Sequence, residues 1–94
     1  MRKSVGNMNL VIDAGNTNTV FGVFEDDVLV HTFRLESDSD MTFVDLFDEI
    51  SNRMKAFSIE MNSIGTIALS SVIPKLTEIF SEFENKLENV NFIN

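Results

Sequence analysis

The sequence predicts an α/β protein with a five-stranded mixed sheet, strand order 3-2-1-4-5, and helices on both faces. Two observations lead to this fold class. The segment at residues 8–14 is apolar on both faces, as is typical of a central strand covered on two sides. Two longer segments place apolar residues at helical spacing, and they supply the helices that would cover the sheet.

The first part of the chain is expected to form an antiparallel meander. Strands are predicted at residues 8–14, 19–24 and about 28–35, each rich in β-branched or aromatic residues. The acidic residues 25–27 form the turn between the second and third strands, where a solvated hairpin tip is the simplest interpretation.

Helices and strands alternate in the second part of the chain. A polar loop at residues 37–40, rich in helix-capping types, precedes a first helix, and a buried strand is expected at 64–72. Pro74 suits the first turn of a second helix, because its missing N–H would have no partner there, and residues 90–93 can add a short last strand. The apolar stripe of the first helix comprises Phe43, Leu46, Phe47, Ile50, Met54 and Phe57, and that of the second Leu76, Ile79, Phe80, Phe83 and Leu87.

Length and composition indicate one small domain with one core. The chain has 94 residues, 44% of them hydrophobic, and no internal repeat or linker divides it. Its formal charge of −8 argues against a nucleic-acid partner, because such affinity depends on Lys and Arg at phosphates. No apolar segment has membrane-spanning length. The absence of cysteine excludes disulfides and suits a cytoplasmic protein.

The most informative stretch is residues 10–24, where one apolar strand ends at Asp13 and another leaves from Thr19. Between them lies the turn Gly15-Asn16-Thr17-Asn18, which can present backbone N–H groups and short polar side chains to one point. A carboxylate beside such a turn suits a nucleotide phosphate with its magnesium ion. The alternative is an ordinary hairpin whose turn residues serve only their backbone angles.

Other ligand signatures are missing or weak. Neither Gly-x-Gly-x-x-Gly nor Gly-Lys-Ser/Thr occurs, so dinucleotide and Walker-type sites lack their motifs. His31 is the single histidine, and no other metal-ligating residues surround it at ligand spacing. It is therefore expected to be a surface residue of a strand.

Two ordered motifs stand out in the sequence. They are Asp-Ala-Gly-Asn-Thr-Asn-Thr-Val-Phe-Gly-Val at residues 13–23 and Leu-Ser-Ser-Val-Ile-Pro at residues 69–74. The first resembles the first phosphate motif of the type III pantothenate kinases, and the second is similar to the Ser-Ser-Val-Val-Pro segment of that family, at about the expected distance downstream. The resemblance implies ATP-dependent phosphorylation of pantothenate in coenzyme A biosynthesis. It also implies a ribonuclease H-like subdomain of the acetate kinase, sugar kinase, Hsp70 and actin superfamily.

The same resemblance implies the site residues and ligands. Asp13 is expected to hold magnesium, Ser70 and Ser71 could line the substrate pocket, and a monovalent cation, potassium or ammonium, is implied besides ATP. The full-length enzyme would be a cytoplasmic homodimer that binds ATP and pantothenate. The residues expected at the ATP phosphates are Asp13, Ala14, Gly15, Asn16, Thr17, Asn18, Thr19 and Val20.

One family motif does not occur in this sequence. The family's catalytic base lies in a Gly-Ala-Asp-Arg segment, which is absent, so no catalytic residue is expected in this chain and the base is expected beyond Asn94. Residues 8–94 would then be the N-terminal subdomain of a longer kinase, inactive alone, and residues 1–7 an upstream extension or a vector remnant. The alternative is a non-catalytic regulatory protein of the same fold, similar to transcriptional accessory factors.

Overall fold

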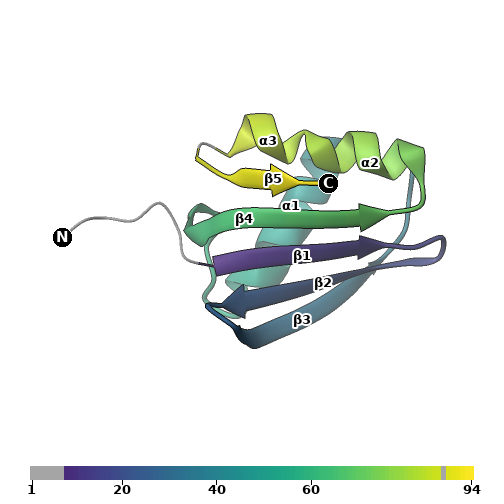
Figure 1. The fold of residues 1–94 in the computed structure, drawn as a ribbon. Helices are drawn as coiled ribbons and strands as arrows, with labels where there is room; N and C mark the ends of the chain where they lie inside the picture. The colour runs from purple at the N-terminus through teal and green to yellow at the C-terminus, as the bar shows by residue number, and fades with distance from the viewer. Residues whose placement is uncertain (1–7, 88) are drawn as a thin grey trace.

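The predicted strand order is confirmed. The computed structural model describes residues 8–87 and 89–94, so the extension predicted at residues 1–7 lies outside the described residues. The strands form one five-stranded sheet in the order β3-β2-β1-β4-β5 (Figure 1). The elements are β1 (Met8–Ala14), β2 (Asn18–Glu25), β3 (Val28–Glu36), α1 (Phe43–Lys55), the 3-10 turn η1 (Met61–Ser63), β4 (Ile64–Ser71), α2 (Pro74–Ser81), α3 (Phe83–Lys86) and β5 (Asn91–Ile93).

The sheet is mixed, as expected. β2 is antiparallel to both β1 and β3, while β4 runs parallel to β1 and β5 parallel to β4. The β2–β3 turn is tight, because Glu25 pairs with Val28 and Asp26 takes a positive φ of 57°. Asp tolerates this left-handed conformation better than most residues, which is one reason for an acidic hairpin tip.

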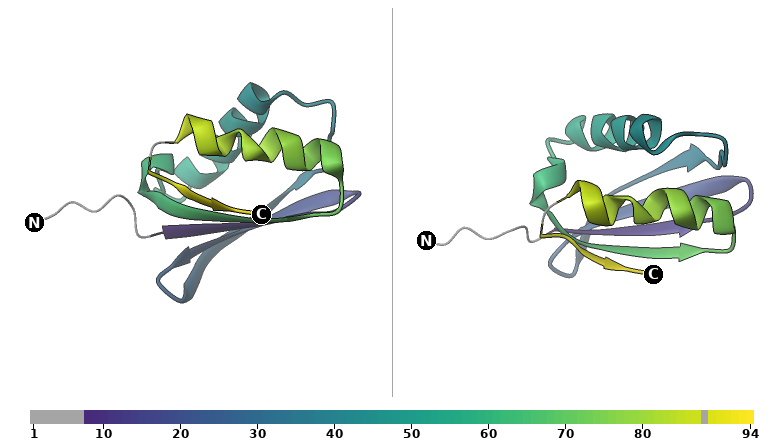
Figure 2. Two further views of the ribbon diagram at one scale, coloured as in Figure 1. Left: turned by 45° about the horizontal axis from the view of Figure 1, so that its top comes forward. Right: turned by 90° about the horizontal axis from the view of Figure 1, so that it is seen from above.

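The prediction of helices on both faces of the sheet is wrong. The helices α1, α2 and α3 of the described residues all cover one face, as both views in Figure 2 show. The ring of Phe83 in α3 lies 5.0 Å from that of Phe43 and 5.7 Å from that of Phe47, both in α1. Among the described residues, nothing covers the opposite face, where the side chain of Val11 in β1 is 41% exposed.

The direction of the crossovers explains this arrangement. β3, β4 and β5 are mutually parallel, and the chain passes from β3 to β4 through α1 and from β4 to β5 through α2 and α3. Both crossovers move in the same direction along the sheet. Because parallel crossovers are almost always right-handed, two successive crossovers in one direction place their helices on the same face. Helices on opposite faces would require a reversal of direction.

Local sequence sets the helix boundaries. The hydroxyl of Thr42 accepts a hydrogen bond from the N–H of Asp45 at 3.1 Å and caps α1, and Pro74 opens α2 as predicted. α1 ends at Lys55, two residues before Phe57, so the prediction that Phe57 belongs to the apolar stripe of this helix is wrong. Phe57 is 57% exposed, and its ring stacks on His31 at a centroid distance of 3.4 Å.

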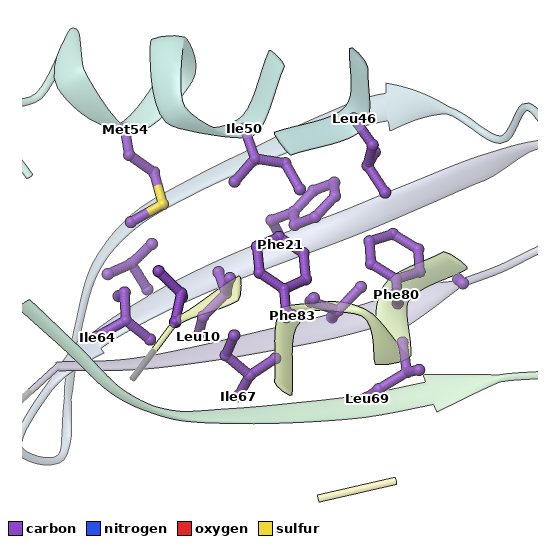
Figure 3. Close-up of a cluster of buried hydrophobic side chains, with 14 of the residues drawn as sticks. Leu10, Phe21, Leu46, Ile50, Met54, Ile64, Ile67, Leu69, Phe80 and Phe83 are labelled. Atoms are coloured by element: carbon purple, nitrogen blue, oxygen red, sulfur yellow. The ribbon is translucent and has the colours of Figure 1, made fainter. Parts of the chain in front are cut away.

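A single core lies between the helices and the covered face of the sheet (Figure 3). Phe21 of β2 is fully buried at its centre, stacked on Phe33 at 4.6 Å and 6.1 Å from Phe80 of α2. The other large side chains buried there are Leu10, Ile12, Val23, Ile50, Met54, Ile67 and Phe83. One aromatic side chain thus joins the meander to a helix of the second crossover.

The replacement of Phe21 by Ala should lower the free energy of unfolding by about 3–5 kcal/mol, because it leaves a cavity between sheet and helices. Urea denaturation followed by circular dichroism measures this loss. Val44→Ala is the control, since Val44 lies on α1 with 67% of its side chain exposed, and it should change stability by less than about 0.5 kcal/mol. Equal effects of the two substitutions would contradict the assignment of Phe21 to the core.

His31 lies on the edge strand β3 but is partly buried, because Phe57 stacks on it. Its burial, and secondarily the positive charge of Arg53, lower the pKa of the imidazole below its ordinary value of 6.5. The unfolded chain therefore binds more protons than the folded chain between the lowered pKa and pH 6.5. The contribution of His31 to the free energy of unfolding should be fully present above pH 6.5 and be lost as the pH falls through this window.

A proton NMR titration of this single histidine should give a midpoint below pH 6.5 in the folded chain. Phe57→Ala, which exposes the imidazole, should raise the midpoint most, and Arg53→Gln should raise it less, following the order of the two causes. Lys55→Gln is the control, because it removes the other positive charge in the last turn of α1, which is not among the causes of the lowered pKa of His31. A wild-type midpoint at or above 6.5 would contradict the packing described for His31.

Candidate functional site

Asp13 lies one residue before the end of β1, on the uncovered face of the sheet. Its neighbours in the strand, Ile12 and Ala14, point into the core, so the alternation of side chains directs Asp13 outward. It pairs with Val20 of β2 and with Ser70 of β4, and both are also exposed. The carboxylate and the Ser70 hydroxyl therefore belong to adjacent strands on one open face.

The turn that follows β1 is closed by backbone contacts. The N–H of Gly15 donates to the carbonyl of Asn18 at 3.0 Å, and a Cβ on Gly15 would lie 3.1 Å from that oxygen. Such a contact is tighter than most real Cβ contacts, so glycine suits the position. Asn16 and Thr17 form the exposed tip, and within the described residues neither of their N–H groups has an acceptor. The turn thus offers two free N–H donors beside a carboxylate.

Ser37, the first residue after β3, holds this turn from the side. Its hydroxyl donates to the Gly15 carbonyl and lies 3.0 Å from the Thr19 hydroxyl, and its N–H donates to the Thr17 carbonyl at 2.8 Å. The sequence predicts only a polar loop at Ser37. Ser37 is 22 positions from Gly15 and 18 positions from Thr19 in the sequence, so no local pattern indicates these contacts. They arise because β3 pairs with β2 and ends level with the turn.

Of the remaining predicted site residues, some have side chains that are buried or bonded locally, and others have side chains on the open face. The side chains of Ala14 and Thr19 are buried on the core side of the sheet, so only their backbone is available to a ligand. Val20 faces outward beside Asp13. Ser70 shares that open face, whereas the Ser71 hydroxyl is engaged locally with the backbone N–H and carbonyl of Ile73, both at 3.1 Å.

The turn and the end of β4 lie at the same end of the sheet (Figure 1). A groove of about 480 Å³ opens beside the turn, between the edge strand β3 and α1. Its lining carries charges of both signs, from Arg34, Glu36, Asp38, Glu49 and Arg53, and includes Asn18. The turn is therefore accessible from this side as well as from the open face.

The free N–H groups of the turn and the Asp13 carboxylate together suit an anion that binds in complex with a cation. Unpaired N–H groups of a turn form a concave site for phosphate oxygens, and the Asp13 carboxylate is a hard oxygen ligand. The described residues contain no group of three His, Cys, Asp or Glu side chains that could hold a metal alone. Magnesium commonly binds one or two carboxylates together with phosphate oxygens and water, so Asp13 beside the turn fits magnesium carried by a nucleotide.

No helix of the described part of the chain has the length and apolar character needed to cross a membrane.

Solved structures similar to this chain confirm its fold. They include the apo pSK41 ParM protein, with a TM-score of 0.66 at 13% identity over 94% of this chain and 36% of that protein. The Alp12 filament structure gives a TM-score of 0.69 at 9% identity, over 99% of this chain and 44% of that one. A protein from Bacteroides thetaiotaomicron described as having an actin-like ATPase fold is also similar, with a TM-score of 0.62 at 15% identity, over 96% of this chain and 34% of that one. At such identities the likeness shows the fold alone.

Sequence comparisons show the family. The family model for type III pantothenate kinase matches residues 9–93. A type III pantothenate kinase from Desulfosudis oleivorans is 38% identical over 79 residues, which cover 84% of this chain and 31% of the relative. One from Halalkalibacterium halodurans is 41% identical over 76 residues, 73% of this chain and 27% of the relative. The chain thus spans about a third of the length of these relatives, and it belongs to the type III pantothenate kinase family.

Proposed function

We propose that this chain is the phosphate-binding part of an ATP-dependent pantothenate kinase. In this proposal residues 8–94 form its N-terminal ribonuclease H-like subdomain. The observation that carries the proposal is the placement of the Asp13 carboxylate beside a turn with two free N–H groups, at residues 16 and 17. Both lie within the segment that matches the family.

The residues of the site would divide the work as follows. The N–H groups of Asn16 and Thr17 bind phosphate oxygens of ATP, and Asn18 flanks them at the start of β2. Asp13 holds the magnesium ion, which neutralises phosphate charge when bound. Ser70 contacts a ligand from the neighbouring strand. Phosphoryl transfer depends mainly on positioning and electrostatic stabilisation, and this set of donors would contribute to both.

The rest of the activity would come from residues outside this chain. The catalytic base is proposed to lie beyond Asn94, together with most of the pantothenate pocket and the adenosine contacts. The family resemblance also favours a monovalent cation, potassium or ammonium, a homodimer and a cytoplasmic location. No particular contact in the described residues favours the alternative of a non-catalytic regulatory protein.

A graft tests the role of Asp13. Residues 9–93 would replace the matching segment of the Desulfosudis oleivorans kinase, and pantothenate phosphorylation would be followed with a coupled ADP assay. Asp13→Asn in the graft should lower kcat about 100-fold to 1,000-fold, because the site loses one well-placed charge. Asp27→Asn, at the exposed β2–β3 turn, is the matched control and should leave kcat unchanged. A folded graft without activity, or an Asp13→Asn graft within a few-fold of the parent, would contradict the proposal.

The 94-residue chain alone should not phosphorylate pantothenate, because the base motif is absent from it. Its affinity for Mg·ATP should be low, with Kd on the order of millimolar, since a single phosphate turn buries little of the ligand. The coupled assay measures the first expectation and a ¹⁵N NMR titration with Mg·ATP the second. Robust turnover by the isolated chain would show that a base lies within it and would overturn the proposed division of the enzyme.

A further inference from the structure

The direction of the hydrogen bonds around Ser37 follows from its chemistry. A serine hydroxyl has one hydrogen, and that of Ser37 is donated to the Gly15 carbonyl. The Thr19 hydroxyl, 3.0 Å away, must therefore be the donor in its bond to Ser37. Thr19 is only 3% exposed, so the Thr19 end of this pair of hydrogen bonds is shielded from water. The other end is the Gly15 carbonyl, which belongs to the peptide group between Gly15 and Asn16.

That peptide group carries one of the two free donors at the tip of the turn. The described chain contains no cis peptide bond, and in a trans peptide the carbonyl and the N–H point in opposite directions. A hydroxyl that holds the Gly15 carbonyl on the side of the β3–α1 connection therefore directs the Asn16 N–H to the opposite side, away from Ser37. The bond from the Ser37 N–H to the Thr17 carbonyl holds a second peptide plane of the same turn.

We propose that Ser37 is a positioning residue for phosphate binding: its hydroxyl orients the Gly15–Asn16 peptide so that the Asn16 N–H is presented to the ligand. This inference rests on the proposed function, because it takes the turn as the phosphate site. A hydrogen bond to the carbonyl also polarises the peptide, so the Asn16 N–H becomes a stronger donor. Ser37 itself does not contact the phosphate.

The experiment uses the 94-residue chain labelled with ¹⁵N and ¹³C. Without ligand, Ser37→Ala should shift the Asn16 amide and the Gly15 carbonyl resonances, because it removes the bond that orients their shared peptide. In titrations with Mg·ATP, Ser37→Ala should weaken binding about fivefold to tenfold, the effect of one lost hydrogen bond of ordinary strength. Adenosine, which lacks phosphates, should leave the turn amides unshifted in every variant.

Three further variants separate orientation from simple packing. Ser37→Thr keeps the hydroxyl and should retain affinity within about twofold. Ser37→Cys keeps the volume but offers only a weak donor, so it should lose affinity as Ser37→Ala does, and it preserves the test if the Ala variant folds poorly. Ser39→Ala is the matched control, because Ser39 lies in the same loop, is exposed and makes no hydrogen bond to the turn within the described residues. It should change neither the resonances nor the affinity.

The outcomes distinguish the inference from the function on which it rests. If wild type shows no shifts at residues 15–18 with Mg·ATP, the phosphate-site proposal fails for this chain, and the ligand-free spectra still decide whether Ser37 orients the peptide. If wild type binds and Ser37→Ala or Ser37→Cys binds equally well, the positioning role is wrong. It is also wrong if Ser37→Thr loses as much affinity as Ser37→Ala, since the hydroxyl would then not be the group that matters.

Discussion

The one-sided covering of the sheet is the constraint on which the rest of the structure depends. Because both crossovers move in the same direction, the described helices lie on one face, and the strands separate core residues from exposed residues mainly by alternation, interrupted in β4 between Ile64 and Ile67. In β1 this sends Leu10, Ile12 and Ala14 inward and Val11 and Asp13 outward. The same alternation that builds the core thus delivers the carboxylate of the candidate site to an open face.

The candidate site combines a rigid strand end with a turn held from outside. β1 is the middle strand of the sheet, paired along its length with β2 and β4, so the position of Asp13 is fixed on both sides. The turn after it would be freer, but Ser37 and Thr19 tie it to the end of β3. Precise binding needs donors whose orientation is set before the ligand arrives, and this arrangement meets that need with backbone groups and two hydroxyls.

The acidic character of the chain does not conflict with an anionic ligand. With a net charge of −8, the average field repels phosphate, and much of the acidity lies away from the turn, for example at Asp26 and Asp27 at the far end of the meander. Local N–H dipoles act at contact distance, while exposed charges more than about 10 Å away are screened by salt. Glu36, Asp38 and Glu49 line the groove beside the turn together with Arg34 and Arg53, and Asp13 becomes favourable only with a cation between it and the phosphate.

The strands, the order of elements and the candidate turn were determined by the sequence itself. Hydrophobic periodicity and the first-turn position of Pro74 are local signals, and they located the strands and the start of α2 to within about two residues. The N-cap of α1 is Thr42, which lies outside the polar loop predicted at residues 37–40. The motif at residues 13–23 indicated the family because it is contiguous. These features could be predicted because each depends on neighbouring residues.

The tertiary structure decided what holds the turn and showed which face the helices cover. A strand such as β1, apolar at both Leu10 and Val11, does not by itself reveal an open face; the open face follows from the strand order once both crossovers are taken as right-handed. The contact of Ser37 with Gly15 joins residues far apart in sequence, and it exists only because β2 and β3 pair in one register. Local patterns carry no information about such pairing, because register and handedness arise when the whole sheet is assembled.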